Sequence, residues 1–431
     1  MPDWPVRAAA LAAIVLVAAC AGPSPTPSTS PSTVAPAPPV EGLASVPVQV
    51  PDDLNASPFD APRQAMVPTG WTLSVWARVP KARLAAWTPD GALLISQPST
   101  GQVIKLTPTP AGSPQSSVLL TGLDQPHGLA FAEDTLYVAE SDQIDAYTYA
   151  DGAATDQGVV APGLPDAKSP DLRGAYSHAL KSVAVGRDGA VYFSIGSTGN
   201  ISADDRDASP PRASVMRVPP GGGPAAPFTT GVRNGTGLAV APDGAVWTAV
   251  NNRDNVQYPD PGTDFGRVLP AYVNDHPPES VARLTQNREL GWPFCNPDGG
   301  PADLSFIRDV QTNADGAELD CDALPPVEQS MGAHSAPLGM SFAELPAPFG
   351  AGALIGVHGS WNRQPPRAPE VSFYPWRDGT LANQQTLVGG FQDANGSRWG
   401  RPVAAVVGPD GAVYITDDDA GAVYRLAAPA R

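Results

Sequence analysis

One strand–turn–strand pattern recurs along the chain and limits the possible folds more than any other feature. Each copy is an apolar strand, a tight turn and a second apolar strand, as in HALKSVAVGRDGAVYFSIG at residues 178–196. The other clear copies are ARLAAWTPDGALLISQ, PHGLAFAEDTLYVAE, GTGLAVAPDGAVWTAVN and RPVAAVVGPDGAVYITDD. Asp-Gly favours the positive φ angles of a type I′ hairpin turn. No long stretch after residue 60 has the period of an amphipathic helix, so the chain is predicted to be mostly β.

The spacing of these turns predicts a β-propeller. The intervals between the turn aspartates are 44, 54, 55 and 167 residues, counted over Asp90, Asp134, Asp188, Asp243 and Asp410. The last interval spans three blades, and a sixth copy with an enlarged hairpin loop lies inside it, SAPLGMSFAELPAPFGAGALIGVHGS. Periods of about 40 to 60 residues with about four strands each are typical of propellers. We predict an all-β fold, a six-bladed β-propeller with four-stranded blades over residues 61–431, with an inserted loop region at about 251–330.

The first 60 residues have the features of an exported protein. Arg7 precedes the apolar run AAALAAIVLVAAC, which is too short to span a bilayer comfortably. The run ends in Val-Ala-Ala-Cys, which resembles the bacterial lipobox, so Cys20 is the expected lipidation site; an ordinary signal peptide or a short membrane anchor is the alternative. The Pro/Ser/Thr-rich residues 21–60 are predicted to be a disordered tether. We expect residues 1–20 to be a lipoprotein signal peptide and the protein to be extracytoplasmic, lipid-anchored to the bacterial cell membrane.

Two cysteines remain if Cys20 is lipidated. Cys295 and Cys321 are an even pair in a protein that is expected to be exported, and such pairs usually form a disulfide. Two free thiols or metal-bound thiolates are the alternatives, although neither cysteine has the neighbouring Cys or His spacing of a zinc site.

The residues that precede the first strand of each copy point to a binding site. That strand is expected to be the innermost of its blade, so its first residue lies at the mouth of the central channel. These head residues are Arg83, His127, His178, Arg233 with Asn234, His334 and Arg401. A single one is most simply a cap or a solvated side chain, but together they would bind a multiply charged anion. The net charge of −17 opposes a nucleic-acid partner, so the anion is expected to be small.

Longer motifs resemble one known family. GVRNGTGLAVAPDG, VNNRDN, RELGWPFCNPD, AHSAPLGMSF, VHGSWNR and RPVAAVVGPDGAVYITD are similar, in this order, to the glucose/sorbosone dehydrogenase family of exported six-bladed propellers, in particular to its sorbosone dehydrogenase-like branch. The resemblance covers residues 65–427. Members of this family use pyrroloquinoline quinone (PQQ), a tricarboxylate that is held at the channel mouth with Ca²⁺. The resemblance therefore implies a quinoprotein oxidoreductase.

The resemblance also implies roles for individual residues. His178 matches the family's catalytic base, which takes a proton from a sugar's anomeric hydroxyl or an aldehyde hydrate while hydride passes to the quinone C5. Arg233 would stabilise the negative charge that develops on the quinone oxygen. The backbone carbonyls of Asn252 and Arg253 match the Ca²⁺ ligands. The other expected cofactor contacts, head residues included, are Asn234, Asn251, His334, Arg401, Arg83 and His127.

The sequence departs from the family at three places. A lysine that pairs with a cofactor carboxylate on the fifth blade is missing, and His358 or Arg363 is expected to replace it. The family's Arg-Asn-Pro is Arg-Asn-Gly here. One arginine of its sixth-blade pair aligns with Trp399, next to Arg398.

Three further groups were candidates for a site. Asp417, Asp418 and Asp419 resemble a metal cluster but are predicted to form a solvated turn. Asp254, Asp275 and Glu279 are candidates for a second Ca²⁺ site, and loop solubility explains them equally well. Trp292 and Trp361 are candidates for stacking on a sugar, although tryptophan is as often a core residue.

Three functions are compatible with these observations. The leading hypothesis is PQQ- and Ca²⁺-dependent oxidation of a sugar or a related polyol or aldehyde, with electrons passed to an acceptor in the cell envelope. The alternatives are a propeller lactonase or other hydrolase, and a non-catalytic surface lipoprotein that binds a glycan or a protein. The sequence identifies neither the substrate nor the electron acceptor.

Overall fold

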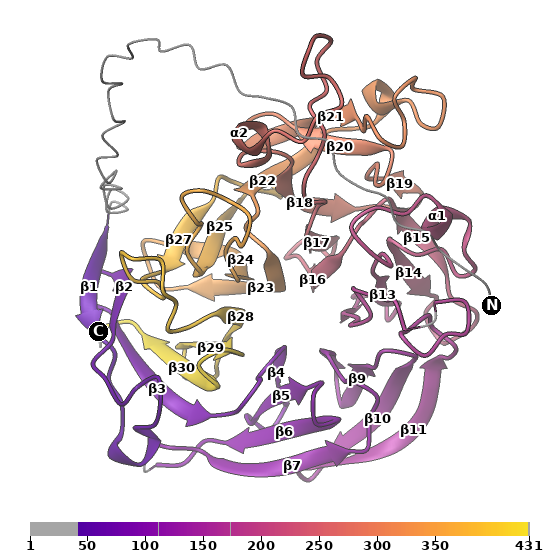
Figure 1. Cartoon of the computed structure of the whole chain (residues 1–431). Helices are drawn as coiled ribbons and strands as arrows, with labels where there is room; N and C mark the ends of the chain where they lie inside the picture. Colours follow the sequence, from indigo (N-terminus) through magenta and orange to yellow (C-terminus); the bar gives the residue numbers. More distant parts are fainter. Residues whose placement is uncertain (1–41, 111, 173, 430–431) are drawn as a thin grey trace, which may run out of the picture. The chain divides into compact units, whose positions relative to one another are not determined.

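The six sequence copies form the two inner strands of six blades (Figure 1). The computed structural model describes residues 42–110, 112–172 and 174–429. The predicted signal peptide, Cys20 and the first part of the predicted tether lie outside these residues. The strands of blades 1 to 3, given from the innermost outward, are as follows: blade 1 has β4 (Ala85–Trp87), β5 (Leu93–Gln97), β6 (Gln102–Thr107) and β7 (Gln115–Thr121); blade 2 has β8 (Gly128–Ala132), β9 (Thr135–Ala139), β10 (Ile144–Ala150) and β11 (Ala153–Ala161); blade 3 has β12 (Val183–Val185), β13 (Val191–Ile195), β14 (Ser214–Val218) and β15 (Ala226–Thr230).

Blade 4 has β16 (Gly235–Val240), β17 (Val246–Val250), β18 (Pro278–Leu284) and β22 (Val327–Ala333), and blade 6 has β28 (Pro402–Val407), β29 (Val413–Asp417), β30 (Ala422–Ala427) and β3 (Thr72–Arg78). Blade 5 has β23 (Pro337–Leu345), β24 (Gly350–Val357) and β25 (Glu370–Arg377), and both β26 (Thr380–Leu381) and β27 (Gln385–Val388) pair with β25.

The inner strands close a ring. β4, β8, β12, β16, β23 and β28 each contact the inner strand of the next blade, and β28 contacts β4. The outermost strand of blade 6 comes from the other end of the chain, because β3 pairs antiparallel with β30 (Figure 1). The predicted six-bladed propeller is therefore confirmed.

The hairpin turns between the two inner strands are not the predicted type I′ turns. In the first copy the N–H of Gly91 donates to the carbonyl of Thr88 at 3.0 Å, and Gly91 has a φ of +83°, whereas Asp90 does not have a positive φ. The reason is Pro89, whose fixed φ suits the second position of a type I turn. The turn aspartate instead accepts a hydrogen bond from the backbone two residues on, as Asp243 Oδ1 does from Ala245 at 3.0 Å.

The hydrophobic core lies between neighbouring blades. β5, β13, β17 and β29 are buried along their whole length, because each blade is covered on both faces by its neighbours. This explains why their sequences are continuous apolar runs rather than alternating ones. Close approach of inner strands also selects glycine: a Cβ at Gly237 would lie 2.4 Å from the carbonyl oxygen of Leu338 in the next blade.

The insertion widens blade 4 and forms more than the predicted loops. It contains the short helix α2 (Pro270–Val273) and the strands β19 (Arg288–Glu289), β20 (Cys295–Asp298) and β21 (Ala302–Arg308). β20 and β21 extend the sheet of blade 4 outward, and β19 pairs with blade 3 (Figure 1). The predicted disulfide between Cys295 and Cys321 is present, and it joins β20 to the 3₁₀ helix η2 (Cys321–Ala323).

Part of the predicted tether, which was expected to reach residue 60, is folded in the described structure. β1 (Leu43–Pro47) pairs with β2 (Gln64–Pro68), and the 3₁₀ helix η1 (Asp52–Leu54) lies between them. Phe59 is buried, with its ring edge-on to Trp399 and Tyr424. The tether prediction is therefore wrong for this last stretch, because Phe59 and its neighbours bury apolar surface against blade 6. None of the described helices is long and apolar enough to cross a membrane.

Candidate active site

The head residues lie where the inner strands begin, and hydroxyl groups from neighbouring strands fix their backbone. Thr416 of β29 donates to the carbonyl of Arg83 at 2.6 Å, and Ser96 of β5 donates to the carbonyl of His127 at 2.7 Å. Each bond joins one blade to the head of the next. Hydrogen bonds therefore connect blade 6 to blade 1 and blade 1 to blade 2 at the mouth of the propeller.

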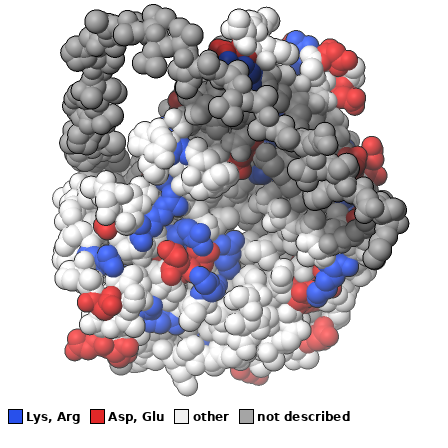
Figure 2. Space-filling view, viewed as in Figure 1, with Lys and Arg blue, Asp and Glu red and all other residues white. Residues whose placement is uncertain are grey.

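Three side chains from three blades, Arg83, Arg401 and His358, contact Asp418, and His127 of a fourth blade lies against Arg83; we call this group the arginine side of the mouth. One carboxylate oxygen accepts from Arg83 at 2.8 Å, and the other accepts from Arg401 at 2.8 Å and lies 3.5 Å from His358 Nε2. Arg83 also lies 3.4 Å from His127 Nε2. Figure 2 shows a similar mixture of signs near the middle of the face in view, where basic side chains surround acidic ones.

Both imidazoles on the arginine side are neutral. Burial and the charge of Arg83 lower the pKa of His127 to about 3, and its Nδ1–H donates to the carbonyl of Lys181 at 3.1 Å. Burial, Arg83 and Arg401 lower the pKa of His358 well below its usual value. The Nε of Arg83 and Nε2 of His358 are buried and have no hydrogen-bond partner among the described residues. Unpaired buried polar atoms are costly, so this side of the mouth is suited to a ligand that brings hydrogen-bonding groups.

The prediction that Asp417, Asp418 and Asp419 form a solvated turn is wrong for the first two. Asp417 is completely buried and accepts from the backbone of Arg401 at 2.7 Å and from Tyr424 at 3.0 Å. Asp418 is buried as the common partner of the arginine side. Asp418 is not a head residue: it follows β29, whose end lies beside the head of β28.

His178 is an oriented, neutral imidazole. Its Nδ1 lies 3.0 Å from the carbonyl oxygen of Ser197 and can only donate to it, which leaves Nε2 unprotonated. Burial and the nearby Arg233 lower the pKa of His178 to about 4. Gly196 permits this position, because a Cβ there would lie 2.6 Å from the Cβ of His178. A neutral imidazole with an unprotonated Nε2 can accept a proton there.

Arg233 lies beside His178 and is almost fully buried. Its guanidinium donates to the carbonyls of Asn251 at 3.1 Å and Asn252 at 2.8 Å, and to both oxygens of Asn200. The predicted Ca²⁺ ligand at Asn252 is therefore a carbonyl that already accepts one hydrogen bond. The side chain of Arg253 is directed elsewhere, because it forms a buried ion pair with Asp309 in the insertion.

Asp254 and His334 form a second ion pair at the mouth. His334 Nε2 donates to the carbonyl of Val273 at 2.6 Å, and its Nδ1 lies 3.3 Å from Asp254 Oδ1. Burial opposes the charge of the imidazole, but the hydrogen bonds to Asp254 and Val273 outweigh it and raise the pKa of His334. Asn362 donates to the same oxygen of Asp254 at 3.1 Å. We call the group of His178, Arg233, Asp254, His334 and Asn362 the His178 side of the mouth.

The other predicted site residues are distributed as follows. Asn251 donates to the carbonyl of Pro337 at 2.6 Å, and Asn234, which contacts blade 3 near Gly196, accepts from the backbone of Asn251 at 3.0 Å. Of the two candidates to replace the family's lysine, His358 lies on the arginine side. Arg363 instead pairs with Asp275 and the carbonyl of Asn274.

The aromatic and acidic candidate residues lie in different environments and do not form one site. Trp399 is a core residue that donates to Gly390, and Trp292 is buried and donates to the carbonyl of Asn200. Trp361, in contrast, is 74% exposed. The second Ca²⁺ site is not assembled, because Asp275 pairs with Arg363 while Glu279 is buried on β18 and accepts from the backbone of Asn252.

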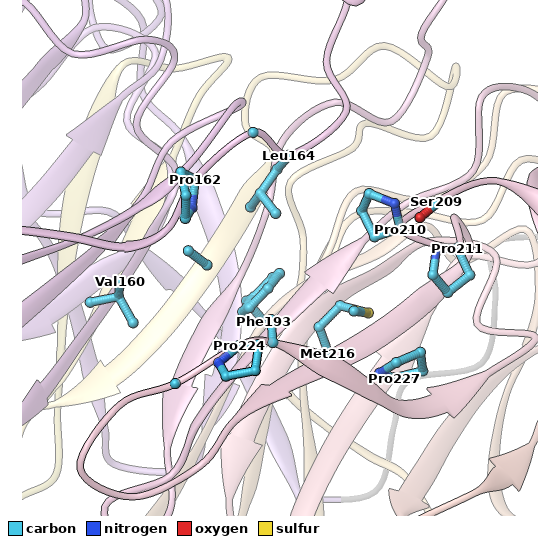
Figure 3. Close-up of a pocket in the computed structure, with 14 residues that line it drawn as sticks. Val160, Pro162, Leu164, Phe193, Ser209, Pro210, Pro211, Met216, Pro224 and Pro227 are labelled. Atoms are coloured by element: carbon cyan, nitrogen blue, oxygen red, sulfur yellow. The ribbon is translucent and has the colours of Figure 1, made fainter.

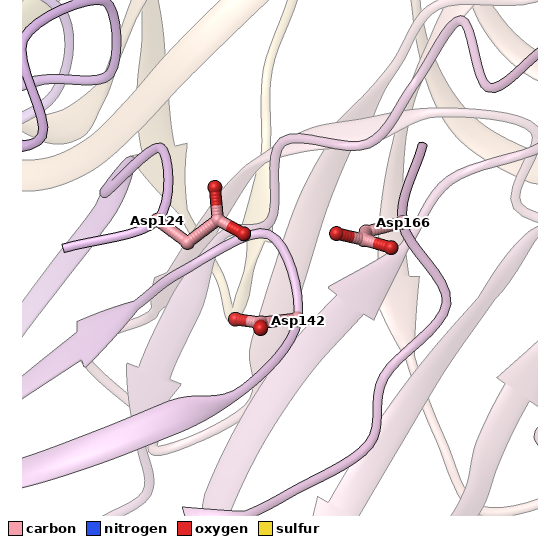
Figure 4. Close-up of side chains that lie close together, drawn as sticks. All are labelled: Asp124, Asp142 and Asp166. Carbon is pink, nitrogen blue, oxygen red and sulfur yellow. The ribbon is translucent and has the colours of Figure 1, made fainter. Parts of the chain in front are cut away.

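Two features outside the mouth were not found from the sequence. Asp124, Asp142 and Asp166 place carboxylate oxygens within 4.8 Å of one another beside the loop that carries His178 (Figure 4). Lys168 pairs with Asp124 there. A cavity of about 500 Å³, lined mainly by proline and apolar side chains such as Leu164, lies at the outer part of blades 2 and 3 (Figure 3). No head residue lines this cavity, so it is not the candidate site.

Replacing Asp418 with asparagine is expected to lower the free energy of unfolding. The amide keeps the shape but leaves Arg83 and Arg401 without their counter-ion, and removing one partner of a buried pair costs about 3 kcal/mol or more. Urea unfolding measures the change. The control is Asp264→Asn, which removes an exposed ion pair with Arg267 and is expected to cost about 0–1 kcal/mol. Equal losses in the two variants would contradict the central role of Asp418.

The ring of inner strands and the charged groups at its mouth define the class of the protein: a six-bladed propeller with an axial site. The protein belongs to the TrAA12-like family, whose model matches residues 65–428. The holo PQQ domain of pyranose dehydrogenase from Coprinopsis cinerea has the same fold, with a TM-score of 0.68 and 21% identity over 84% of this chain and 97% of that one. So does a calcium structure of the family AA12 enzyme of Trichoderma reesei, with a TM-score of 0.68 and 18% identity over 84% and 96% of the two chains.

A curated relative agrees with this placement. The PQQ-dependent pyranose dehydrogenase of Coprinopsis cinerea is 25% identical over 306 residues, which are 58% of this chain and 40% of that protein. The first curated relatives are matched over only 26% and 40% of their own lengths. The resemblance seen in the sequence motifs is confirmed, because the family model covers the propeller, the solved structures have its fold, and a curated relative is a PQQ-dependent pyranose dehydrogenase.

Proposed function

We propose that the protein is a PQQ- and Ca²⁺-dependent dehydrogenase of a sugar or a related polyol or aldehyde. The observation that carries the proposal is His178, a neutral imidazole with a fixed tautomer at a mouth that also holds buried guanidinium groups. Membership of the TrAA12-like family and the PQQ-dependent relative support it.

The residues on the arginine side fit a tricarboxylate. Arg83 keeps an unpaired Nε, and Arg401 binds Asp418 through Nε alone, so both guanidinium groups retain donors for carboxylate oxygens. His358 would take the place of the family's lysine as a neutral partner. The carbonyls of Asn252 and Arg253 would supply hard oxygen ligands for Ca²⁺. The residues present therefore fit the cofactor, although Asp418, which contacts both guanidinium groups, carries an opposing charge.

The chain's own residues would prepare the substrate. Nε2 of His178 would accept the proton of the reacting hydroxyl, while Ser197 holds the ring in the required tautomer. Arg233 would stabilise negative charge near that hydroxyl, because its guanidinium is held by carbonyls and not by a carboxylate. PQQ, when bound, supplies a two-electron acceptor for the hydride of the substrate.

The cellular setting is part of the same proposal. The Val-Ala-Ala-Cys sequence ending at Cys20 supports a lipid anchor on the outer side of the bacterial cell membrane, and the disulfide is typical of proteins outside the cytoplasm. An acceptor in the cell envelope would then receive the electrons.

The test is cofactor titration followed by a substrate survey. The purified chain is titrated with PQQ in the presence of Ca²⁺ by calorimetry and absorbance, and dye reduction is then measured with a panel of aldoses. We expect saturable binding of one PQQ and activity that requires it. Absence of PQQ binding would refute the proposal, and lactone hydrolysis without added cofactor would favour the hydrolase alternative.

A further inference from the structure

The two sides of the mouth differ in hydrogen-bonding character. On the arginine side, the polar groups that have no hydrogen-bond partner among the described residues are mainly donors: the Nε of Arg83 and the terminal nitrogens of Arg401. On the His178 side, the polar groups that receive no hydrogen bond from a described residue are acceptors. No described residue donates to Nε2 of His178, to Oδ2 of Asp254 or to Oδ1 of Asn362, and this last atom is buried.

Three neighbouring side chains hold Asp254 in place, and its carboxylate oxygen Oδ2 receives no hydrogen bond from a described residue. Its Oδ1 is held by His334 and Asn362, and its backbone N–H and carbonyl are both hydrogen-bonded to the side-chain amide of Asn200 at 2.7 and 2.9 Å. The side chain is 25% exposed, although most of its surroundings are buried. A carboxylate held in this way is positioned to accept from a ligand, since its remaining oxygen has no competing donor among the described residues.

Asp254 is close to the proposed base. Its charge acts on both His178 and Arg233, which places it on the same part of the mouth. A free carboxylate oxygen near an unprotonated imidazole nitrogen suits a ligand with several hydroxyl donors.

We propose that Asp254 is a specificity-determining residue that makes the His178 side select neutral or amino sugars and reject sugar acids. The inference rests on the proposed function and names its substrate class. A hydroxyl or ammonium group of the sugar donates to Asp254 Oδ2, whereas a sugar carboxylate at the same place meets a like charge. The arginine side does not provide a second place for the sugar acid when PQQ is bound, because its donors are then used by the cofactor.

The experiment measures binding of D-glucose, D-glucosamine and D-glucuronate by calorimetry, and dye reduction with the same three compounds, for the full chain loaded with PQQ and Ca²⁺. The binding measurement is repeated without PQQ. The variants are Asp254→Asn and the control Asp264→Asn, which changes an exposed aspartate further along the same loop. Asn362→Ala is a second test variant, because it removes a neutral acceptor.

For the wild type with PQQ we expect glucosamine to bind at least about tenfold more tightly than glucuronate, as a charge-assisted contact predicts. Asp254→Asn is expected to bring the two affinities to within about threefold of each other, whereas Asp264→Asn leaves the ratio unchanged. Asn362→Ala is expected to weaken binding of all three sugars and to lower the ratio in part, because it also removes a hydrogen bond that holds Asp254. Equal thermal midpoints of the two aspartate variants show that the change is one of recognition and not of folding.

The experiment distinguishes failure of this inference from failure of the proposed function. Dehydrogenase activity that treats the three sugars alike, or a ratio that Asp254→Asn does not change, overturns the inference and leaves the proposed function intact. Sugar selection by Asp254 without any PQQ binding overturns the proposed function, and the inference then stands for a sugar-binding protein. Loss of Ca²⁺-dependent PQQ binding in Asp254→Asn, with unchanged sugar selection, assigns Asp254 to the cation and overturns the inference.

Discussion

His178→Ala is expected to reduce dye-linked sugar oxidation by about 10²- to 10⁴-fold, which is the usual contribution of a general base. Binding of PQQ is expected to persist, because the buried guanidinium groups of Arg83 and Arg401 belong to other blades and are held by Asp418. The fall is expected in kcat. Steady-state kinetics and PQQ titration of the same preparation measure both effects.

The matched control is His276→Ala. The chain has five histidines, and His276 is the one that does not lie at the mouth; its ring stacks on Tyr272 in the insertion. This variant is expected to keep wild-type kcat. An active His178→Ala enzyme, or equal losses in the two variants, would show that the imidazole at the head of blade 3 is not the base.

The pH profile provides a further check on His178. Because burial and Arg233 lower its pKa to about 4, the unprotonated form is present down to that pH, well below the usual histidine value. The acid limb of kcat/KM for the free enzyme is therefore expected near pH 4. Activity is retained above this value and is lost as the pH falls through it. An acid limb near the ordinary histidine pKa would contradict the lowering of the His178 pKa by burial and Arg233.

Lys181→Met is expected to lower the free energy of unfolding by about 3 kcal/mol or more, because buried carbonyls that lose their donor each cost about 1–3 kcal/mol. Lys181 is completely buried, and its ammonium donates to the carbonyls of Ser141, Pro165 at 2.8 Å and Ala179 at 2.9 Å. Two of these carbonyls belong to the loop that carries His178. The loop is therefore expected to loosen as the protein is destabilised, and kcat to fall.

The control for this variant lies in the same loop. Lys168 is 73% exposed and pairs with Asp124, so Lys168→Met is expected to change the free energy of unfolding by about 0–1 kcal/mol. Urea unfolding and steady-state kinetics are measured for both variants. Equal stability of the two would contradict the role assigned to the buried ammonium.

The sequence predicted the blades well because their signal is local. Each copy contains its own strands and its own turn, and the apolar runs are long enough to be recognised without tertiary information. The type I′ turn was predicted incorrectly: a proline before the Asp-Gly pair favours a different turn in three copies, and the copy with Arg187 at that position forms the same turn. Phe59 was assigned to the tether because its contact with Trp399 joins segments that are far apart in the chain.

The site was predicted only in part for a related reason. Placing one residue at each blade head is a counting argument, and it found His178, Arg233 and Arg401. The counter-ions could not be found in this way. Asp418 follows the second strand of blade 6 and Asp254 follows the second strand of blade 4, and an isolated carboxylate after a strand has no pattern that separates it from a solvated turn.

The pairing of β3 with β30 has a consequence for how the protein forms. Blade 6 combines β3 with β28, β29 and β30, so the ring cannot close until β30 has been synthesised. β3 therefore has no partner strand in the growing chain until β30 arrives. The mouth depends on Arg83 from the first blade and on Arg401 and Asp418 from the last, so it is assembled only when blade 6 closes the ring.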